Sequence, residues 1–142
     1  MKKIFTIAVL AALAAGCSDD DNAPSIDMSQ LYKKWYYVSV TVDGKTTQDH
    51  PLHPCGQDYI EFKANGTVIM TGYRCADASS YTITSPYEVQ PDNMINTMLW
   101  GLSGPTALKK LTEKTLKVQY MYDNDADGDE ELVTRVYTSI AE

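Results

Sequence analysis

The residues best placed to do chemistry form an acidic run near the C-terminus, Asp123-Asn124-Asp125-Ala126-Asp127-Gly128-Asp129. Carboxylates at alternate positions, followed by a glycine that permits a sharp turn, match the Asp-x-Asp-x-Asp-Gly pattern of calcium-binding loops. The expected ligands are the side chains of Asp123, Asp125 and Asp127 and the main-chain carbonyl of Asp129. The alternative interpretation is a polar turn between two strands, because Asp and Gly also favour turns.

A calcium site here would not be an EF-hand. Position twelve of the loop falls on Thr134, where an EF-hand needs a bidentate Glu, and the flanking segments alternate as strands do. The site would therefore lie at the end of a β-hairpin, with Glu130 or Glu131 completing the coordination shell. Calcium is a possible cofactor, and the sequence requires none.

The two histidines lie in a proline-containing segment, His50-Pro51-Leu52-His53-Pro54-Cys55. The prolines favour an extended loop, so the imidazoles would not share a face as they do in helical metal sites. The sequence also contains no Gly-x-Ser-x-Gly motif and no phosphate-binding glycine loop. We therefore expect no catalytic residues and a protein that is not an enzyme.

Residues 1–16 have the composition of an export signal. Lys2 and Lys3 precede an apolar run that is too short to span a bilayer, and Ala14-Ala15-Gly16 supplies small residues just before Cys17. The segment resembles a bacterial lipoprotein signal. That resemblance implies that Cys17 carries fatty acyl groups such as palmitate and becomes the first mature residue.

Ser18-Asp19-Asp20-Asp21 resembles the acidic surface-export tag of Bacteroidota lipoproteins. The resemblance implies a lipid-anchored protein of the outer membrane, exposed at the cell surface. The alternative is that the run is a solvated spacer. Residues 17–28 are poor in apolar side chains and are predicted to form a flexible tether before one domain, residues 29–142.

The charge of the chain excludes one class of partner. The full sequence has a net charge of −7, and removal of Lys2 and Lys3 leaves 10 basic and 19 acidic residues, a net charge of −9. Because no basic stripe is present to neutralise phosphates, nucleic acid is not expected as a partner. Attachment to the membrane would depend on the lipid.

The remaining cysteines are expected to form a disulfide. Asn65-Gly66 predicts a three-residue hairpin loop between Lys63 and Thr67, so that facing residues have numbers summing to 130. Cys55 then lies opposite Cys75, in an oxidising compartment. Such a bridge would contribute on the order of 3 kcal/mol to the free energy of unfolding.

Most of the domain has the period-two alternation of strands. Tyr36, Val38, Val40 and Val42 are predicted to share one face of the first strand, which Asp43-Gly44 ends as a turn. Residues 25–31 predict a helical turn capped by Ser25 or Asp27, and residues 106–111 a short strand or a helical turn. The other predicted strands span 57–63, 66–73, 79–84, 86–90, 93–100, 115–122 and 131–140. This pattern favours an antiparallel barrel or sandwich.

Three groups of residues resemble the lipocalin-like domains of Bacteroidota lipoproteins. They are Leu31-Tyr32-Lys33-Lys34-Trp35, the hairpin from Cys55 to Cys75 with Glu61-Phe62 and Asn65-Gly66, and Lys110-Leu111-Thr112 with Thr115-Leu116. The resemblance implies an up-and-down barrel of about eight strands, often with an internal cavity. It also implies a basic side chain from the last strand stacked over Trp35, for which Arg135 is the candidate. The glycine that lipocalins carry two residues before this tryptophan is replaced by Lys33.

Ten tyrosines and two tryptophans suit the lining of a ligand cavity or a carbohydrate platform. The predicted function is a cell-surface binding module for a small apolar or amphiphilic molecule or a glycan. The alternative is a structural or protein-interaction component of an outer-membrane complex, with a barrel filled by side chains. The sequence does not specify the ligand-binding residues.

Overall fold

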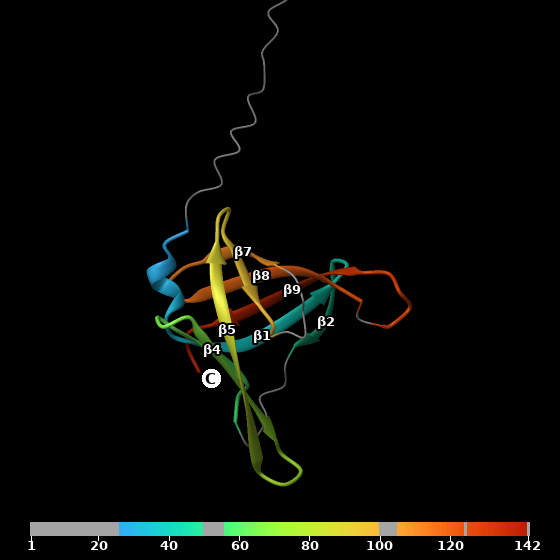
Figure 1. Cartoon of the computed structure of the whole chain (residues 1–142). Coiled ribbons are helices and arrows are strands. Elements are labelled where there is room, and N and C mark those ends of the chain that lie inside the picture. The colour runs from blue at the N-terminus through green and yellow to red at the C-terminus, as the bar shows by residue number, and fades with distance from the viewer. Residues whose placement is uncertain (1–25, 50–55, 100–104, 124, 142) are drawn as a thin grey trace, which may run out of the picture.

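The nine strands form one antiparallel sheet that closes on itself through the pairing of β1 with β9 (Figure 1). This computed structural model describes residues 26–49, 56–99, 105–123 and 125–141. Its elements are η1 (Met28–Leu31), β1 (Lys34–Val42), β2 (Lys45–Asp49), β3 (Tyr59–Lys63), β4 (Thr67–Arg74), β5 (Ser79–Gln90), β6 (Met94–Thr97), β7 (Pro105–Leu111), β8 (Thr115–Tyr122) and β9 (Glu131–Thr138). The predicted all-β antiparallel barrel of about eight strands is confirmed, with β2 as one extra strand.

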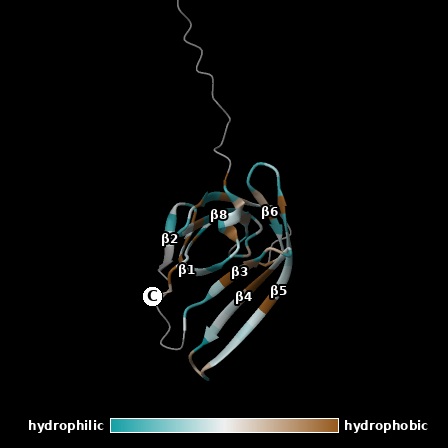
Figure 2. Cartoon of the chain, turned by 90° about the vertical axis from the view of Figure 1, so that its left-hand side faces the viewer, coloured by the Kyte–Doolittle hydropathy of each residue, from teal (hydrophilic) through white to brown (hydrophobic). Residues whose placement is uncertain are grey.

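One edge of β1 is shared between two partners. Lys34–Tyr36 pairs with β3, and from Ser39 onward the same edge pairs with β2. The barrel wall is therefore joined between β1 and β3 over a short stretch only. Figure 2 shows β4 and β5 running on as a pair beyond the closed part of the barrel.

The β3–β4 hairpin has the predicted register. Ile60 pairs with Met70 and Phe62 with Val68, across a three-residue loop in which Gly66 has a φ of 79°. The Gly66 amide donates to the Lys63 carbonyl at 3.2 Å, which closes the turn. The turn residues therefore fix the alignment of both strands.

The predicted face pattern of β1 is wrong because the strand contains a bulge. Tyr37 pairs with Tyr137 of β9, but Ser39 pairs with Val136, so Val38 is an extra residue. The extra residue reverses the alternation, and Tyr37 lies on the inner face with Val40 instead of opposite to it.

Other differences concern where strands begin and end. β2 was not predicted, β5 is continuous where a break at Ser85 was expected, and β6 ends at Thr97. Pro86, which has no amide hydrogen, lies where β5 leaves β4 and joins β6, so it costs no ladder hydrogen bond. Residues 105–111 form a strand, which excludes the helical turn.

One end of the barrel is filled by side chains, and we call it the sealed end. Asp27 caps η1 as predicted, because its carboxylate accepts from the Ser29 amide at 3.0 Å. Leu31 and Trp35 are fully buried there, and the Trp35 indole donates to the Leu31 carbonyl at 2.9 Å. In the described part of the chain, no helix is long and apolar enough to cross a membrane.

Candidate ligand-binding cavity

A partly open cavity of about 370 Å³ lies inside the barrel, beyond the sealed end. Its walls come mainly from the inner faces of β1, β3, β4, β5 and β9. The lining residues are Tyr37, Asp58, Tyr59, Ile60, Met70, Gly72, Tyr81, Leu99, Arg135 and Tyr137. Aromatic rings and a few polar groups around a space of this size are typical of small-molecule sites.

Arg135 brings a positive charge into this cavity. It lies on the same face of β9 as Val133 and Tyr137, which are 3 % and 2 % exposed, so strand alternation directs its side chain inward. The guanidinium lies over the rings of Tyr37 and Tyr120, 5.9 and 5.8 Å from their centroids. Its Nε is buried and has no hydrogen-bond partner among the described residues.

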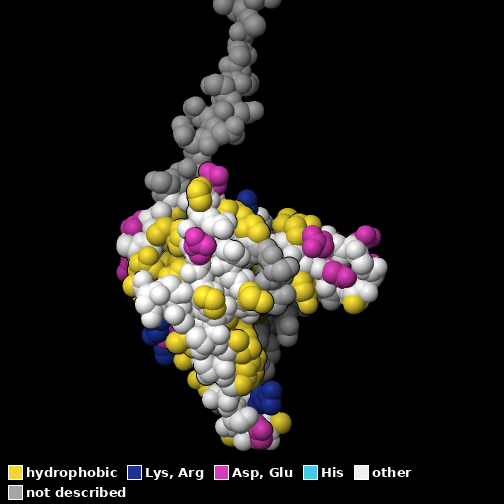
Figure 3. Space-filling model, in the orientation of Figure 1, with side chains coloured by type: hydrophobic (Ala, Val, Ile, Leu, Met, Phe, Trp, Pro, Cys, Tyr) yellow, Lys and Arg dark blue, Asp and Glu magenta, His cyan; other side chains and the backbone are white. Residues whose placement is uncertain are grey.

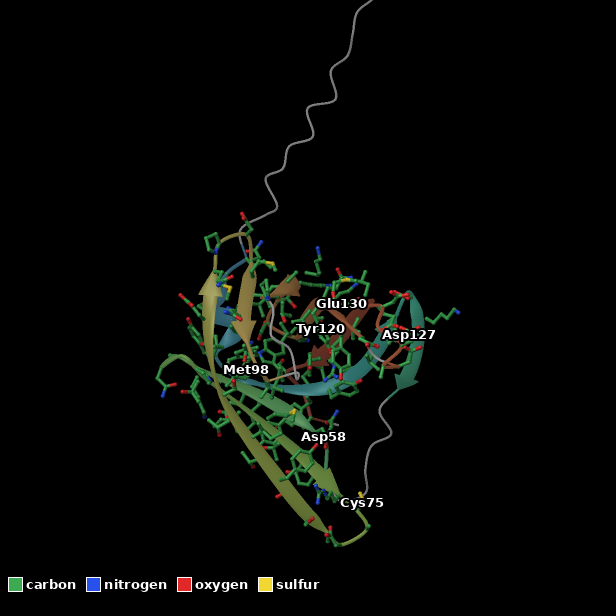
Figure 4. The ribbon with its side chains drawn as sticks, turned by 45° about the vertical axis from the view of Figure 1, so that its right-hand side comes forward. Asp58, Cys75, Met98, Tyr120, Asp127 and Glu130 are labelled. Carbon is green, nitrogen blue, oxygen red and sulfur yellow. The ribbon has the colours of Figure 1, made fainter. Side chains whose placement is uncertain are left out.

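Burial controls the titration of the tyrosines around this cation. Burial raises the pKa of Tyr120 to about 12, and the positive charge of Arg135 offsets only part of that rise. Burial also raises the pKa of Tyr37. These side chains are therefore neutral at physiological pH. Figure 4 shows Tyr120 among the strands of the barrel.

The residue stacked over Trp35 is Lys33, and the assignment of Arg135 to that position is wrong. Lys33 Nζ lies 5.0 Å from the indole centroid and donates to the Glu113 carbonyl at 2.8 Å. Tyr37 is paired with Tyr137, so a residue of the last strand facing Trp35 would have a number near 139. Arg135 lies about four residues away, or about 13 Å along the strand, because each residue adds about 3.3 Å.

Gly72 gives the cavity room for an aromatic ring near its opening. A Cβ at Gly72 would lie 2.4 Å from Cζ of Tyr81, so the absence of a side chain lets this ring lie against β4. The exposed Arg74 lies over the Tyr81 ring, with its Cζ 5.3 Å from the ring centroid.

Among the described residues that line this cavity, Asp58 is the one carboxylate. Its Oδ1 accepts from the Tyr73 amide at 2.9 Å, and its carbonyl accepts from the Tyr37 amide at 3.0 Å. These bonds hold the start of β3 against β1 and β4. Figure 4 places Asp58 on the side of Tyr120 that faces the β4–β5 hairpin.

The predicted calcium residues converge in the β8–β9 loop, which projects from the barrel (Figure 3). The side-chain oxygens of Asp123, Asp125, Asp127 and Glu131 all lie within 4.8 Å of one another. Asp123 Oδ1 is buried without a hydrogen-bond partner, while its Oδ2 accepts from the Gly128 amide at 3.1 Å. Glu131, one of the two suggested additional ligands, joins the group, and calcium binding itself stays a prediction.

Several predicted residues lie outside the described part of the chain. They are Cys17 and the rest of residues 1–25, His50, His53 and Cys55. Cys75 lies just after β4. Lipidation, the surface tag and the pairing of the two cysteines therefore stay predictions.

Sequence reasoning did not assign Arg135 to the cavity, although a signal was present. Val133, Arg135 and Tyr137 alternate in the last predicted strand, and a charged residue between two apolar ones on the same face is unusual for a core strand. The same alternation would have placed Arg135 in the interior.

No protein-family model and no curated protein sequence matches this chain. Solved structures do match. The bovine lipocalin allergen Bos d 2 has a TM-score of 0.51 and 15% identity, covering 81% of this chain and 76% of its own. The odorant-binding protein OBP1 has a TM-score of 0.51 and 16% identity, covering 82% of this chain and 76% of its own. At such low identity the likeness concerns the fold alone, a closed antiparallel barrel of the lipocalin type.

Proposed function

We propose that this protein is a binding protein that holds a small apolar or amphiphilic molecule in the barrel cavity. The observation that carries the proposal is the 370 Å³ space lined by four tyrosines, Met70, Ile60 and Leu99. Ligand sites of about 300–1,000 Å³ with apolar walls and few polar groups accommodate small molecules. The cavity also favours ligand binding over the alternative of a structural or interaction protein with a filled barrel.

The remaining surface offers less support for a binding site. A groove of about 450 Å³ lies outside the barrel, between the segment before η1 and strands β6 and β7. It has exposed lysines at its edge and no aromatic lining residue. Because glycans stack on aromatic rings, a glycan would also be expected at the tyrosine-lined cavity and not in this groove.

Binding of a neutral apolar fluorophore, N-phenyl-1-naphthylamine, tests the proposal directly. The chain from Ser18 onward contains every described residue of the barrel and no lipid anchor. We expect saturable binding, and we expect Met70→Trp to abolish it by filling the cavity. Met121→Trp is the matched control, because Met121 is 48 % exposed and does not line this cavity.

Two results would contradict the proposal. One is the absence of fluorophore binding by the unsubstituted chain. The other is unchanged binding by Met70→Trp while its melting temperature shows that it is folded.

We further propose that the barrel is held at the outer membrane by lipid on Cys17 and is exposed at the cell surface. The support is the signal-like segment before Cys17 and the acidic run Ser18-Asp19-Asp20-Asp21. Other proteins of the same membrane would then be possible partners. Protease treatment of intact cells tests the location: the protein is expected to be cleaved, and replacement of the three aspartates by alanine is expected to protect it without preventing acylation. Full cleavage of that variant would show that the run is only a spacer.

A further inference from the structure

The chain contains two arginines, and their environments differ sharply. Arg74 is exposed at the end of β4 and lies over Tyr81. Arg135 lies on the inner face of β9 and lines the cavity. A guanidinium stays charged at any physiological pH, so Arg135 gives the cavity a permanent positive charge.

The charge of Arg135 is not matched by a carboxylate of the described residues. The groups that act on its guanidinium are the side chains of Tyr137, Tyr120 and Tyr37. Two of these contribute ring faces, and the buried Nε has no hydrogen-bond partner. Because removing a cation from water is costly, an interior guanidinium usually has an anionic partner.

Asp58 lines the same cavity but is used elsewhere. Its carboxylate accepts the Tyr73 amide hydrogen and so holds the start of β3 to the end of β4. It is not among the groups that act on Arg135. The two charges therefore come from different elements of the cavity wall, and both act on Tyr37.

The apolar part of the cavity lies opposite Arg135. Ile60 and Met70 face each other across β3 and β4, and Gly72 beside them is covered by the Tyr81 ring. A molecule that touches both walls would meet a cation with tyrosine hydroxyls at one side and aliphatic and aromatic surface at the other. The charged wall would therefore face the head group of an amphiphile, and the apolar wall would face its apolar body.

We propose that the molecule held in this cavity is an amphiphile with an oxyanion head group, and that Arg135 binds that head group. This inference rests on the proposed function and names the class of its ligand. A carboxylate is the best match, since a planar guanidinium donates two parallel hydrogen bonds to it. The rings of the neighbouring tyrosines surround Arg135, and Met70 and Ile60 would contact the apolar body.

Octanoate and 1-octanol test the inference, because they share a chain length and differ in head group. Each is used to displace N-phenyl-1-naphthylamine from the chain beginning at Ser18, in about 0.15 M salt, where the screening length of about 8 Å suppresses the effect of the protein's overall negative charge. The concentration of octanoate that displaces half of the fluorophore is expected to be at least about tenfold lower than that of 1-octanol. A hydrogen bond to a charged group would give a difference in affinity of this size.

Arg135→Met removes the charge while keeping an apolar side chain. It is expected to weaken octanoate about tenfold or more beyond any change in the binding of 1-octanol. Lys114→Met removes a positive charge from an exposed position outside the cavity lining and is expected to bind both ligands as the unsubstituted chain does. Arg135→Lys keeps the charge without the paired donors, and an intermediate loss for octanoate is expected.

The outcomes separate this inference from the proposed function. Equal competition by octanoate and 1-octanol in the unsubstituted chain would overturn the anionic head group, while the cavity would still be shown to bind. If folded Arg135→Met binds octanoate and 1-octanol more weakly to the same degree, Arg135 has a structural role and the inference is overturned. Failure of the fluorophore and both competitors to bind at all would instead refute the proposed function. If Arg135→Met does not fold, the comparison of the two competitors in the unsubstituted chain and in Arg135→Lys decides the question.

Discussion

Tyr120 is expected to make the barrel less stable as the pH rises above 10. The side chain is 5 % exposed, and burial raises its pKa from 10.0 to about 12. A tyrosine is neutral when protonated, so a raised pKa means that the folded state holds its proton more tightly than the unfolded state. Its contribution is complete below pH 10 and is lost as the pH rises towards 12. One pKa unit corresponds to about 1.4 kcal/mol, so the loss is about 1.4 kcal/mol at pH 11 and at most about 2.7 kcal/mol.

Urea unfolding at pH 8 and at pH 11, followed by tryptophan fluorescence, measures this loss. The free energy of unfolding is expected to fall between pH 8 and pH 11 in both proteins. The fall in Tyr120→Phe is expected to be about 1.4 kcal/mol smaller than the fall in the unsubstituted chain. Comparing the two pH values cancels the cost of removing the hydroxyl itself. Tyr32→Phe is the control, since Tyr32 is 45 % exposed, and it is expected to behave as the unsubstituted chain. An equal fall in Tyr120→Phe and the unsubstituted chain would refute the reasoning.

Three further predictions concern the opening of the cavity and its surroundings. Gly72→Ala is expected to displace the Tyr81 ring, because the added Cβ would lie 2.4 Å from it, and to change the fluorophore affinity. Gly44→Ala is the control: its φ of 76° is expected to lower the stability, but no atom lies within 4 Å of the added Cβ, so the fluorophore affinity is expected to stay the same. Cys55 and Cys75 are expected to be bridged, because the observed register of the β3–β4 hairpin, continued outward, places them opposite each other, and two thiols that react without prior reduction would contradict this. Millimolar calcium is expected to raise the melting temperature more than magnesium does, through the acidic β8–β9 loop, and an equal effect of both ions would indicate screening alone.

Local turn chemistry made parts of the fold predictable. Asn65-Gly66 fixed the register of β3 and β4 residue by residue, because a hairpin loop of given length permits one alignment. Asp43-Gly44 was recognised as a turn, and both residues have positive φ, at 47° and 76°. Such a two-residue turn also predicts a partner strand, which is β2. It was missed because Lys-Thr-Thr-Gln-Asp has no apolar alternation.

Features that depend on neighbours distant in sequence were not predictable in this way. The bulge at Val38 depends on how β1 fits against β9, and nothing in the local sequence requires it. The partner of Trp35 depends on the same pairing, which brings Lys33 over the indole and leaves Arg135 in the cavity. The calcium loop is the opposite case, since its ligand spacing is local and its carboxylates converge as the spacing indicates.

The sealed end has a consequence for the direction in which the protein exchanges its ligand. The chain reaches the barrel at η1, beside the buried Leu31 and Trp35, whereas the cavity lies beyond this plug (Figure 1). With an acylated Cys17, the nine residues leading to Ile26 span at most about 30 Å, at about 3.3–3.6 Å per residue. The anchor would then attach to the domain at its sealed end, whereas the cavity lies beyond that end. The ligand would accordingly enter from the surrounding medium. The membrane would hold the protein in place and would not supply the ligand.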